Sequence, residues 1–421
     1  MLPELIEIVP PAAPVAAVVA LPGSKSLTNR ALVLAALADG PVTLRGALWS
    51  EDTQAMTHCL RTLGFSVDVA PDTAEPANRS ITVEGRGGEI PRAGTADAPL
   101  ELAVENAGTA ARFLAALVCL GRGHYRLSGV PRMHQRPQAA LFTALRELGY
   151  EVQTPNDFLP AVITGGGPRP GAACRVSVAE SSQFASALIL CQARGGWNVE
   201  VTGANEDELP YVDMTRRLVA EFPWSGGEYV IEPDASAASY FWGADWLLRD
   251  AGGSVRVAPA PDSGMQADQQ FAELILRQPW KHSYSRATEL ADSIMTAIVL
   301  APFAPLVTRF TDLGRLRVQE CERVVALRTE LTKCGARVDE QGDTLTVHPG
   351  PLHGAQIATY HDHRMAMCFA MLGLRVPGIR LENPACVKKT FPNFFAKLAA
   401  LGAVMHDADG TPLTGDDLLA D

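Results

Sequence analysis

The chain has 421 residues, of which 47% are hydrophobic and 20% are charged, so it can bury large cores and its length favours two or three domains. Its 36 basic and 47 acidic side chains give a formal charge of -11, which opposes diffuse binding to nucleic acid or to an anionic membrane surface. Any anionic ligand must therefore meet local basic clusters.

The cysteines and the N-terminal segment indicate the compartment. Eight cysteines are spread along the chain without a CxxC pair, which favours reduced thiols over a disulfide framework or a zinc site. The uncharged stretch 8–24 contains four prolines and is too short to span a bilayer. We therefore expect a cytoplasmic protein with neither a secretion signal nor a membrane anchor.

One phrase recurs along the chain. It reads LRTLGFSV from Leu60, LRELGYEV from Leu145, LTKCGARV from Leu331 and LAALGAVM from Leu398. Each copy predicts the end of an amphipathic helix, stopped by a glycine in the left-handed conformation and followed by a strand. Two weaker copies, LVAEFPW and LILRQPW, place proline and tryptophan near the stop. The pattern predicts six repeat units, each with a helix and a strand.

Six further runs are apolar on nearly every face and predict buried helices. In chain order they are ALVLAALA, ARFLAALVCL, FASALILC, SYFWGADWLL, IMTAIVLAPFA and RMAMCFAML. Short strands such as RSITVEG, GSVRVAP and DTLTVHP would pack with them. We expect an α/β protein of two lobes with three helix-sheet units each. The predicted lobes are residues 24–232 and residues 1–23 plus 233–421.

Polar motifs precede five of these buried helices: PGSKSLTNR, ENAGTAAR, ESSQ, ADS and HDHR. Capping of free helix amides explains their serine, threonine and aspartate residues. It does not explain Lys25, Arg30, Arg112 and Arg364, because the helix dipole disfavours cations in the first turn. An anion that binds both the cation and the helix amides would explain them.

Further basic residues gather in PRMHQRP, RLRVQECER and CVKKTFP, where the alternative interpretation is a solvated surface. Asp292 and Glu320 are the acid or base candidates, although Asp292 can also be a helix cap and Glu320 an ion-pair partner. A carboxylate beside fixed cations is ionised and would begin as a base. His361 and His363 do not predict a metal site, because no third ligand is evident.

These motifs, together with LPYVDMT, DASAASYF and CVKKTFPNFF, occur in an order that resembles the 5-enolpyruvylshikimate-3-phosphate synthase family over nearly the whole chain. The resemblance implies two lobes, each of three units around buried helices in an inside-out α/β barrel, with the active site in the cleft between the lobes. It implies transfer of the enolpyruvyl group of phosphoenolpyruvate to the 5-hydroxyl of shikimate 3-phosphate. That reaction leads to chorismate and the aromatic amino acids. It needs no metal and no cofactor, and the resemblance implies a monomer.

The resemblance also assigns site residues. The catalytic group would be Lys25, Asp292 and Glu320. The acceptor would be bound by Lys25, Ser26, Arg30, Ser181, Ser182, Gln183, Tyr211, Asp292, Arg315 and Gln319. Phosphoenolpyruvate would be bound by Lys25, Gly108, Arg136, Gln183, Arg323, Arg364 and Lys389. Arginine forks suit its carboxylate and phosphate, and a carboxylate pair with a lysine is sufficient for the two proton transfers.

Several positions depart from the family pattern. Gln319, Arg315 and Glu208 stand where the family carries lysine, asparagine and serine near the 3-phosphate of the acceptor. If residues 315–319 are helical, Arg315 and Gln319 share a face and the positive charge has moved by one turn. Glu208 would repel a phosphate unless it pairs with an arginine. Phe113, in place of proline, could change the response to the analogue glyphosate.

Three alternatives remain. UDP-N-acetylglucosamine enolpyruvyl transferases share the fold and the donor, but they carry a reactive cysteine where this chain has PRMHQRP. An enolpyruvyl transferase with a changed acceptor is motivated by Gln319 and Glu208. An inactive homologue that only binds these ligands is disfavoured by the presence of Lys25, Asp292, Glu320 and Lys389.

Overall fold

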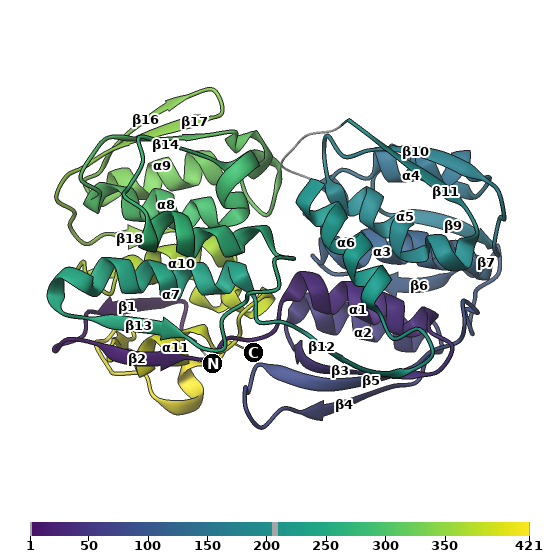
Figure 1. Ribbon diagram of the computed structural model, residues 1–421, viewed down its shortest axis with the longest axis horizontal. Helices are drawn as coiled ribbons and strands as arrows, with labels where there is room; N and C mark the ends of the chain where they lie inside the picture. The colour runs from purple at the N-terminus through teal and green to yellow at the C-terminus, as the bar shows by residue number, and fades with distance from the viewer. Residues whose placement is uncertain (1, 204–208, 421) are drawn as a thin grey trace. The chain divides into compact units, whose positions relative to one another are not determined.

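The structure is a computed structural model that describes residues 2–203 and 209–420. Internal contacts divide the chain into two compact units (Figure 1): Gly23–Glu232, called here the continuous unit, and Met1–Pro22 with Pro233–Asp421, called the split unit. The polypeptide begins in the split unit, forms the continuous unit and then returns. Over the described ranges, no helix is both long enough and apolar enough to cross a membrane.

The continuous unit contains two four-stranded sheets and one two-stranded sheet among its described residues. The first sheet has the order β12 (Gly227–Val230), β3 (Pro41–Leu48), β5 (Asn78–Glu84), β4 (Val67–Pro71). The second has the order β6 (Leu100–Ala103), β7 (Arg122–Ser128), β9 (Ala161–Gly166), β8 (Glu151–Gln153). The third pairs β10 (Ala173–Ser177) with β11 (Asn198–Thr202).

The split unit repeats this composition in the part of the chain that the structure describes. One sheet has the order β18 (Gln356–Ile357), β19 (Ile379–Glu382), β1 (Leu5–Val9), β20 (Val404–His406). Another has the order β14 (Ser283–Ser285), β15 (Thr308–Thr311), β17 (Thr344–His348), β16 (Arg337–Gln341). The two-stranded sheet pairs β13 (Ser254–Val257) with β2 (Ala16–Val19). The predicted strands RSITVEG, GSVRVAP and DTLTVHP are confirmed as β5, β13 and β17.

All four of these larger sheets have the same pairing pattern: one parallel pair, then two antiparallel pairs. Two strand pairings join segments that lie far apart in the sequence. Strand β2 precedes helix α1 (Lys25–Leu37) in sequence but pairs with β13, whereas β12 precedes helix α7 (Ala235–Leu248) but pairs with β3. The β2–β13 pair thus joins the two segments of the split unit, whereas β3 and β12 are the first and last strands of the continuous unit.

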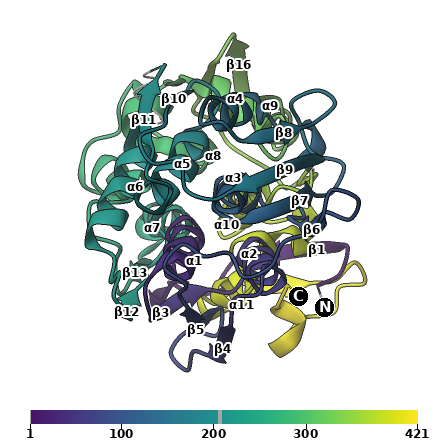
Figure 2. The same cartoon turned by 90° about the vertical axis from the view of Figure 1, so that its right-hand side faces the viewer.

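Six helices confirm the predicted apolar runs. In the continuous unit, α1, α3 (Gly108–Leu117) and α5 (Ser182–Gly195) pack against one another (Figure 2). In the split unit, α7 packs against α8 (Ile294–Leu300) and α10 (His363–Leu372), which also contact each other. Every residue of α3 and α8 is buried. A helix without a polar face is stable only when neighbours surround it, which explains this placement.

The remaining helices carry the repeated phrase. They are α2 (Glu51–Thr62), α4 (Ala139–Glu147), α6 (Leu209–Glu221), α9 (Arg323–Lys333) and α11 (Phe394–Ala400). Gly64, Gly149, Gly335 and Gly402 follow four of them with φ between 86° and 93°, so the predicted left-handed stop is confirmed. The copy LILRQPW differs, because it begins in a π-helical turn, Ala272–Arg277, instead of an amphipathic α-helix.

Candidate functional site

Lys25 is the first residue of α1, and Asp52 on α2 lies opposite it in the continuous unit. The Lys25 Nζ and the Asp52 Oδ2 are 3.3 Å apart, and Asp52 is buried. Asp52 stands in the first turn of α2, where the helix dipole favours a carboxylate. The carboxylate thus offsets the unfavourable position of Lys25 at the N-terminus of α1.

Arg30 lies in the interior of the continuous unit. Its guanidinium donates to Thr215 Oγ1 at 2.7 Å, to the Ser26 carbonyl at 2.9 Å and to Ser186 Oγ at 3.2 Å. The guanidinium also lies 5.2 Å from the centre of the Phe113 ring. Burial lowers the pKa of Arg30 to about 10, which still leaves it charged at neutral pH. This side chain therefore joins α1, α3, α5 and α6, and it is only 2% exposed.

Two guanidinium groups converge on Gly108, the first residue of α3. A Cβ atom at Gly108 would lie 2.6 Å from Arg112 Nη1 and 2.8 Å from Arg136 Nη2. Both arginines are buried; Arg112 donates to the Pro137 carbonyl at 2.8 Å, and Arg136 donates to the Asn106 carbonyl at 3.2 Å. Two fixed cations beside the amides of a helix N-terminus form a suitable binding site for a phosphate or carboxylate.

The start of α5 lies beside this cationic site. Ser181 caps the helix by accepting a hydrogen bond from the Gln183 amide at 3.3 Å, so the capping interpretation of ESSQ is confirmed. Arg112 Nη1 and Gln183 Oε1 are 3.5 Å apart. Ser182, the first residue of α5, is 3% exposed. The predicted acceptor residues 181–183 therefore adjoin the predicted donor residues around Gly108.

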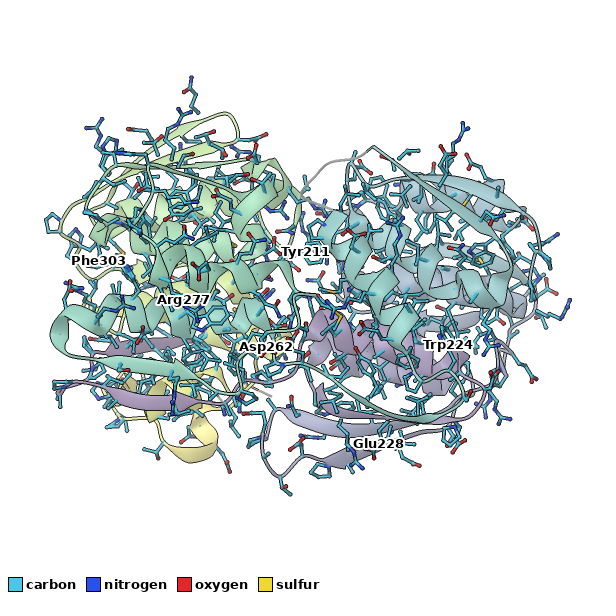
Figure 3. The ribbon with its side chains drawn as sticks, viewed as in Figure 1. Tyr211, Trp224, Glu228, Asp262, Arg277 and Phe303 are labelled. Carbon is cyan, nitrogen blue, oxygen red and sulfur yellow. The ribbon has the colours of Figure 1, made fainter. Side chains whose placement is uncertain are left out.

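Tyr211 lies on α6, in the first turn after the residues that the structure does not describe (Figure 3). Its carbonyl accepts a hydrogen bond of 2.8 Å from Thr215 Oγ1, the same hydroxyl that Arg30 contacts. Tyr211 is thus linked to Arg30 through one side chain. Glu208, whose effect on a phosphate was in question, lies outside the described residues.

Asp292 in the split unit lies between two arginines. Its Oδ1 is 3.1 Å from Arg286 Nη2, and its Oδ2 is 3.4 Å from Arg364 Nη2. Burial opposes ionisation, but Arg364, Arg286 and Arg323 outweigh it and hold the pKa of Asp292 well below its usual range. Asp292 is therefore ionised at neutral pH, as the sequence predicted.

Arg323, the first residue of α9, is surrounded by oxygen acceptors. Its Nε is 2.7 Å from Asp362 Oδ2, its Nη2 is 2.8 Å from Glu320 Oε2, and its Nη1 donates to Gln319 Oε1. Burial works against the charge of Arg323, but Asp362 and Glu320 outweigh it and raise the pKa of Arg323. Glu320 is therefore an ion-pair partner of Arg323 in this structure, which is one of the two interpretations of this residue.

Arg364 is positioned from two sides at the start of α10. Its amide donates to Asp362 Oδ1 at 2.9 Å, and its Nη2 lies 3.4 Å from Ser236 Oγ. Ser236 in turn donates to Asp268, which also accepts the Ser293 amide at 2.8 Å. Burial raises the pKa of Asp268, with Asp292 adding to the shift. Asp268 thus connects Arg364 to the backbone that carries Asp292.

The segment with Arg315 and Gln319 is not the α-helix that the shared-face argument requires. Residues Leu313–Val318 form a 3₁₀-helix, and Gln319 lies beyond its end with a φ of -91° and a ψ of -139°. A 3₁₀-helix brings residues three apart onto one face, so the four-residue spacing does not align these two side chains. The expected relocation of charge by one helical turn is therefore wrong as a geometric argument.

The other predicted basic residues divide into two kinds. Lys389 ends a short helix, Pro384–Lys389, and is 4% exposed. Arg317 instead pairs with Glu322, Glu340 and Asp343. The alternative interpretation as a solvated surface thus fits the partly exposed Arg317, whereas Arg323 in the same cluster is buried.

Sequence reasoning missed five residues that organise these sites: Asp52, Ser236, Asp268, Arg286 and Asp362. Asp362 carried a visible signal, since it stands directly before the buried α10 and its side chain caps that helix. Asp52 carried a weaker one, in the first turn of α2. Arg286 stands in the segment SRATEL, which had no pattern to mark it.

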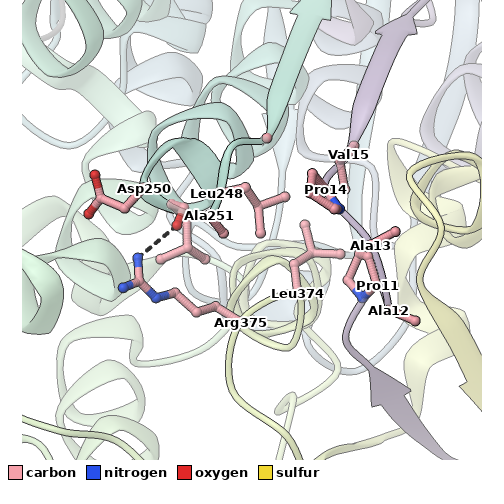
Figure 4. Close-up of a pocket in the computed structure, with 12 residues that line it drawn as sticks. Pro11, Ala12, Ala13, Pro14, Val15, Leu248, Asp250, Ala251, Leu374 and Arg375 are labelled. Atoms are coloured by element: carbon pink, nitrogen blue, oxygen red, sulfur yellow. Dashed lines mark hydrogen bonds between the residues drawn. The ribbon is translucent and has the colours of Figure 1, made fainter.

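A separate pocket lies in the split unit, between residues 11–15 and the C-terminal end of α7 (Figure 4). Leu248, Leu374 and the prolines and alanines of residues 11–14 give it apolar walls, and Arg375 donates to the Leu247 carbonyl at 2.8 Å. The residues that line it include none of the site residues described above. We therefore do not assign the chemistry to this pocket.

Comparisons with known proteins agree on one family. The family model for EPSP synthase (3-phosphoshikimate 1-carboxyvinyltransferase) matches residues 9–225 and 223–398. A 3-phosphoshikimate 1-carboxyvinyltransferase from Opitutus terrae is 40% identical over 95% of this chain and 98% of its own length. One from Trichormus variabilis is 37% identical over 91% of this chain and 96% of its own length.

Solved structures show the same two-domain mixed α/β fold. EPSP synthase from Acinetobacter baumannii matches with a TM-score of 0.72 at 22% identity, over 96% of this chain and 100% of that one. The enolpyruvyl transferase NikO from Streptomyces tendae matches with a TM-score of 0.68 at 18% identity, over 97% of this chain and 99% of that one. At such identities the likeness concerns the fold alone. The sequence matches decide the family, and the chain belongs to the EPSP synthase family.

Proposed function

We propose that this protein transfers the enolpyruvyl group of phosphoenolpyruvate to the 5-hydroxyl of shikimate 3-phosphate and releases phosphate. This is the reaction of 3-phosphoshikimate 1-carboxyvinyltransferase, a step of the shikimate pathway to the aromatic amino acids. The observation that carries the proposal is the pair of buried guanidinium groups, Arg112 and Arg136, that converge on Gly108 at the N-terminus of α3. Phosphoenolpyruvate has two anionic groups that such a site would bind.

The donor is bound, in this proposal, by cations from both units. The Gly108 site supplies Arg136, with Gln183 beside it, and the split unit supplies Arg323, Arg364 and Lys389. Arginine is suited to this role because its planar fork bonds a carboxylate or a phosphate through two parallel hydrogen bonds. The buried positions of Arg136, Arg323 and Lys389 support strong interactions, since charges attract more strongly where water is excluded.

The acceptor is bound, in this proposal, beside α1 and α5. Its contacts are Lys25, Ser26, Arg30, Ser181, Ser182, Gln183, Tyr211, Asp292, Arg315 and Gln319. The hydrogen bonds of Arg30 to Thr215 and Ser186 support a positioning role for this arginine, because they already hold its guanidinium in the interior. Serine hydroxyls and helix amides at the start of α5 suit the 3-phosphate.

The chemistry is an addition followed by an elimination. A proton is added to the methylene carbon of the donor, the acceptor 5-hydroxyl bonds to the neighbouring carbon and loses its own proton, and a tetrahedral adduct forms. In the second step the methyl group returns a proton, the double bond re-forms and the carbon–oxygen bond to phosphate breaks. We assign these transfers to Lys25, Asp292 and Glu320, whose roles reverse between the steps.

The proposal also concerns the architecture of the two lobes. We infer that the six sheets are six copies of one helix-sheet unit, three in each lobe of an inside-out α/β barrel. The pairing pattern that the four larger sheets share and the six buried helices support this interpretation. Closure of the lobes on the substrates would exclude water from the reactive intermediate. We also propose a cytoplasmic monomer, which a molar mass measured by light scattering would test.

The test is phosphate release by the purified protein. Given phosphoenolpyruvate, the protein should release phosphate with shikimate 3-phosphate, and much more slowly with shikimate or with UDP-N-acetylglucosamine. Absence of turnover with shikimate 3-phosphate would refute the proposal. Turnover with UDP-N-acetylglucosamine instead would identify the other enolpyruvyl transferase activity, and binding of phosphoenolpyruvate without any turnover would identify an inactive homologue.

A second candidate function is enolpyruvyl transfer to a changed acceptor. The observation that favours it is the hydrogen bond from Arg323 to Gln319, at the position where the family carries a lysine. A neutral amide that serves Arg323 adds no positive charge for an acceptor phosphate. Turnover that is faster with shikimate than with shikimate 3-phosphate would favour this candidate.

A further inference from the structure

Arg286 is a buried cation that the assigned roles do not use. It begins a π-helical turn, Arg286–Leu290, and its side chain is 2% exposed. Ala291 follows this turn with a φ of 45°, a conformation that non-glycine residues adopt at a cost. On the far side of Ala291, Asp292 Oδ1 lies 3.1 Å from Arg286 Nη2. The contact that a role for Arg286 has to explain is the one with Asp292.

The neighbourhood of Arg286 is a set of alternating charges, which we call the arginine–carboxylate cluster. Its members are Arg286, Asp292, Arg364, Arg323, Glu320 and Asp362. Its ion pairs include Arg286–Asp292 at 3.1 Å, Asp292–Arg364 at 3.4 Å, Arg323–Glu320 at 2.8 Å and Arg323–Asp362 at 2.7 Å. Asp268 lies against the same cluster through Ser236. Among the six members of the cluster, removal of Arg286 would leave the carboxylates Asp292, Glu320 and Asp362 with only Arg323 and Arg364.

We propose that Arg286 is a positioning residue for donor binding. Its guanidinium pairs with Asp292 and so weakens the attraction of that carboxylate for Arg364, whose positive charge then attracts the anionic donor. The inference rests on the proposed function, in which Arg364 binds phosphoenolpyruvate. The contact of Asp292 with Arg286 is 3.1 Å long, which is shorter than its contact of 3.4 Å with Arg364. Without Arg286, Asp292 has Arg364 as its nearest cation and competes with the donor for it.

The test is titration calorimetry with phosphoenolpyruvate alone, so that no turnover occurs. Arg286→Met should weaken donor binding by a factor on the order of ten to a hundred, the effect of one extra buried negative charge near an anion. Arg286→Lys, which keeps the charge, should bind the donor nearly as the wild type does. Arg249→Met, which removes an arginine from an exposed pair with Asp245, is the matched control and should leave the affinity unchanged.

The double variant separates charge from structure. Asp292→Asn combined with Arg286→Met removes both charges, so donor affinity should return close to the wild-type value. A merely structural role for Arg286 predicts weak binding in both the single and the double variant, which would overturn the inference. If Arg286→Met alone does not fold, the double variant can still be tested, because it leaves neither buried charge without its partner. Its donor affinity should again be close to that of the wild type.

The failure of the proposed function looks different from the failure of this inference. If the wild-type protein does not bind phosphoenolpyruvate at all, the donor assignment is wrong. If the wild type binds it and Arg286→Met binds it equally well, only the inferred role of Arg286 is wrong. Loss of donor affinity in a folded Arg286→Lys variant would also contradict the inference, because the charge is retained there.

Discussion

The two units hold their arginines in different ways. In the continuous unit, Arg30 bonds two hydroxyls and a carbonyl, and Arg112 and Arg136 bond backbone carbonyls. In the split unit, Arg286, Arg323 and Arg364 each bond a carboxylate. The hydrogen bonds of the first arrangement go to neutral oxygens, whereas those of the second go to carboxylates, which can exchange protons.

This difference indicates a division of work in the proposed reaction. Arginines bonded to neutral oxygens can bind anions without a change in protonation, because their charge is fixed over the whole physiological pH range. Carboxylates held by arginines can accept a proton and return it, since the arginine stabilises the ionised form. We therefore expect changes at Gly108 and its neighbouring arginines in the continuous unit to alter affinity, and changes at the carboxylates of the split unit to alter turnover.

The largest effect is expected from Glu320→Gln. The variant keeps the shape of the side chain but removes the carboxylate that Arg323 contacts, so turnover should fall by a factor of about a hundred to ten thousand. Phosphate release under saturating substrates measures it. Glu322→Gln is the matched control, because Glu322 caps α9 and pairs with Arg317 on the surface. A comparable loss of turnover in the control would show that Glu320 has no special role.

Gly108→Ala should act on affinity in the continuous unit. The added methyl group would approach Arg112 and Arg136 more closely than real Cβ atoms do, so the two guanidinium groups must move. We expect the KM for phosphoenolpyruvate to rise by about ten- to a hundred-fold, as expected when a fixed charge contact is displaced. Gly350→Ala, where nothing lies within 4 Å, should leave the KM unchanged. A fall in kcat alone would contradict the proposed division of work.

Arg315→Ala tests whether Arg315 contributes to binding of the acceptor phosphate. If Arg315 contacts the acceptor phosphate, the KM for shikimate 3-phosphate should rise by about ten-fold, the typical loss of one charge-assisted hydrogen bond, while the KM for shikimate changes little. Arg309→Ala, on an exposed position of β15, is the control for loss of a surface arginine. An equal rise for both acceptors would remove Arg315 from the phosphate site.

The smallest effect concerns stability and pH. The three arginines Arg364, Arg286 and Arg323 depress the pKa of Asp292, so its ionised form stabilises the folded state above the unfolded pKa of about 4. This contribution is lost as the pH falls below that value. The Tm advantage of the wild type over Asp292→Asn should thus be constant from about pH 6 to 8 and shrink towards about pH 3. A constant difference over the whole range would contradict the paired state of Asp292.

Most of the fold followed from patterns that act locally. The six apolar runs predicted the buried helices, since a helix without a polar face must be enclosed. The glycines at 64, 149, 335 and 402 predicted the helix ends, because they stand where only a left-handed residue closes the turn. The pairing of β2 with β13 had no such local signal, as strands that pair across an insertion of two hundred residues share no sequence pattern.

The site was predicted less completely. Helix starts marked Lys25, Arg30, Arg112 and Arg364, because a cation in a first turn is visible in sequence, whereas Gly108 and Ser181 were assigned through the family resemblance. Ion pairs that join distant segments, such as Arg323–Asp362, were not visible, and no propensity predicts the positive φ of Ala291 between Arg286 and Asp292. The predicted shared face of Arg315 and Gln319 was wrong because the segment is a 3₁₀-helix.

The most direct test of the proposed reaction measures where solvent deuterium and the phosphate group appear in the products. The purified protein is given phosphoenolpyruvate and shikimate 3-phosphate in deuterium oxide, and the products are read by proton and phosphorus NMR. An addition followed by an elimination predicts inorganic phosphate together with an enolpyruvyl ether of the acceptor, with solvent deuterium in its methylene group. Pyruvate with a newly phosphorylated acceptor, or an ether without deuterium, would contradict the account.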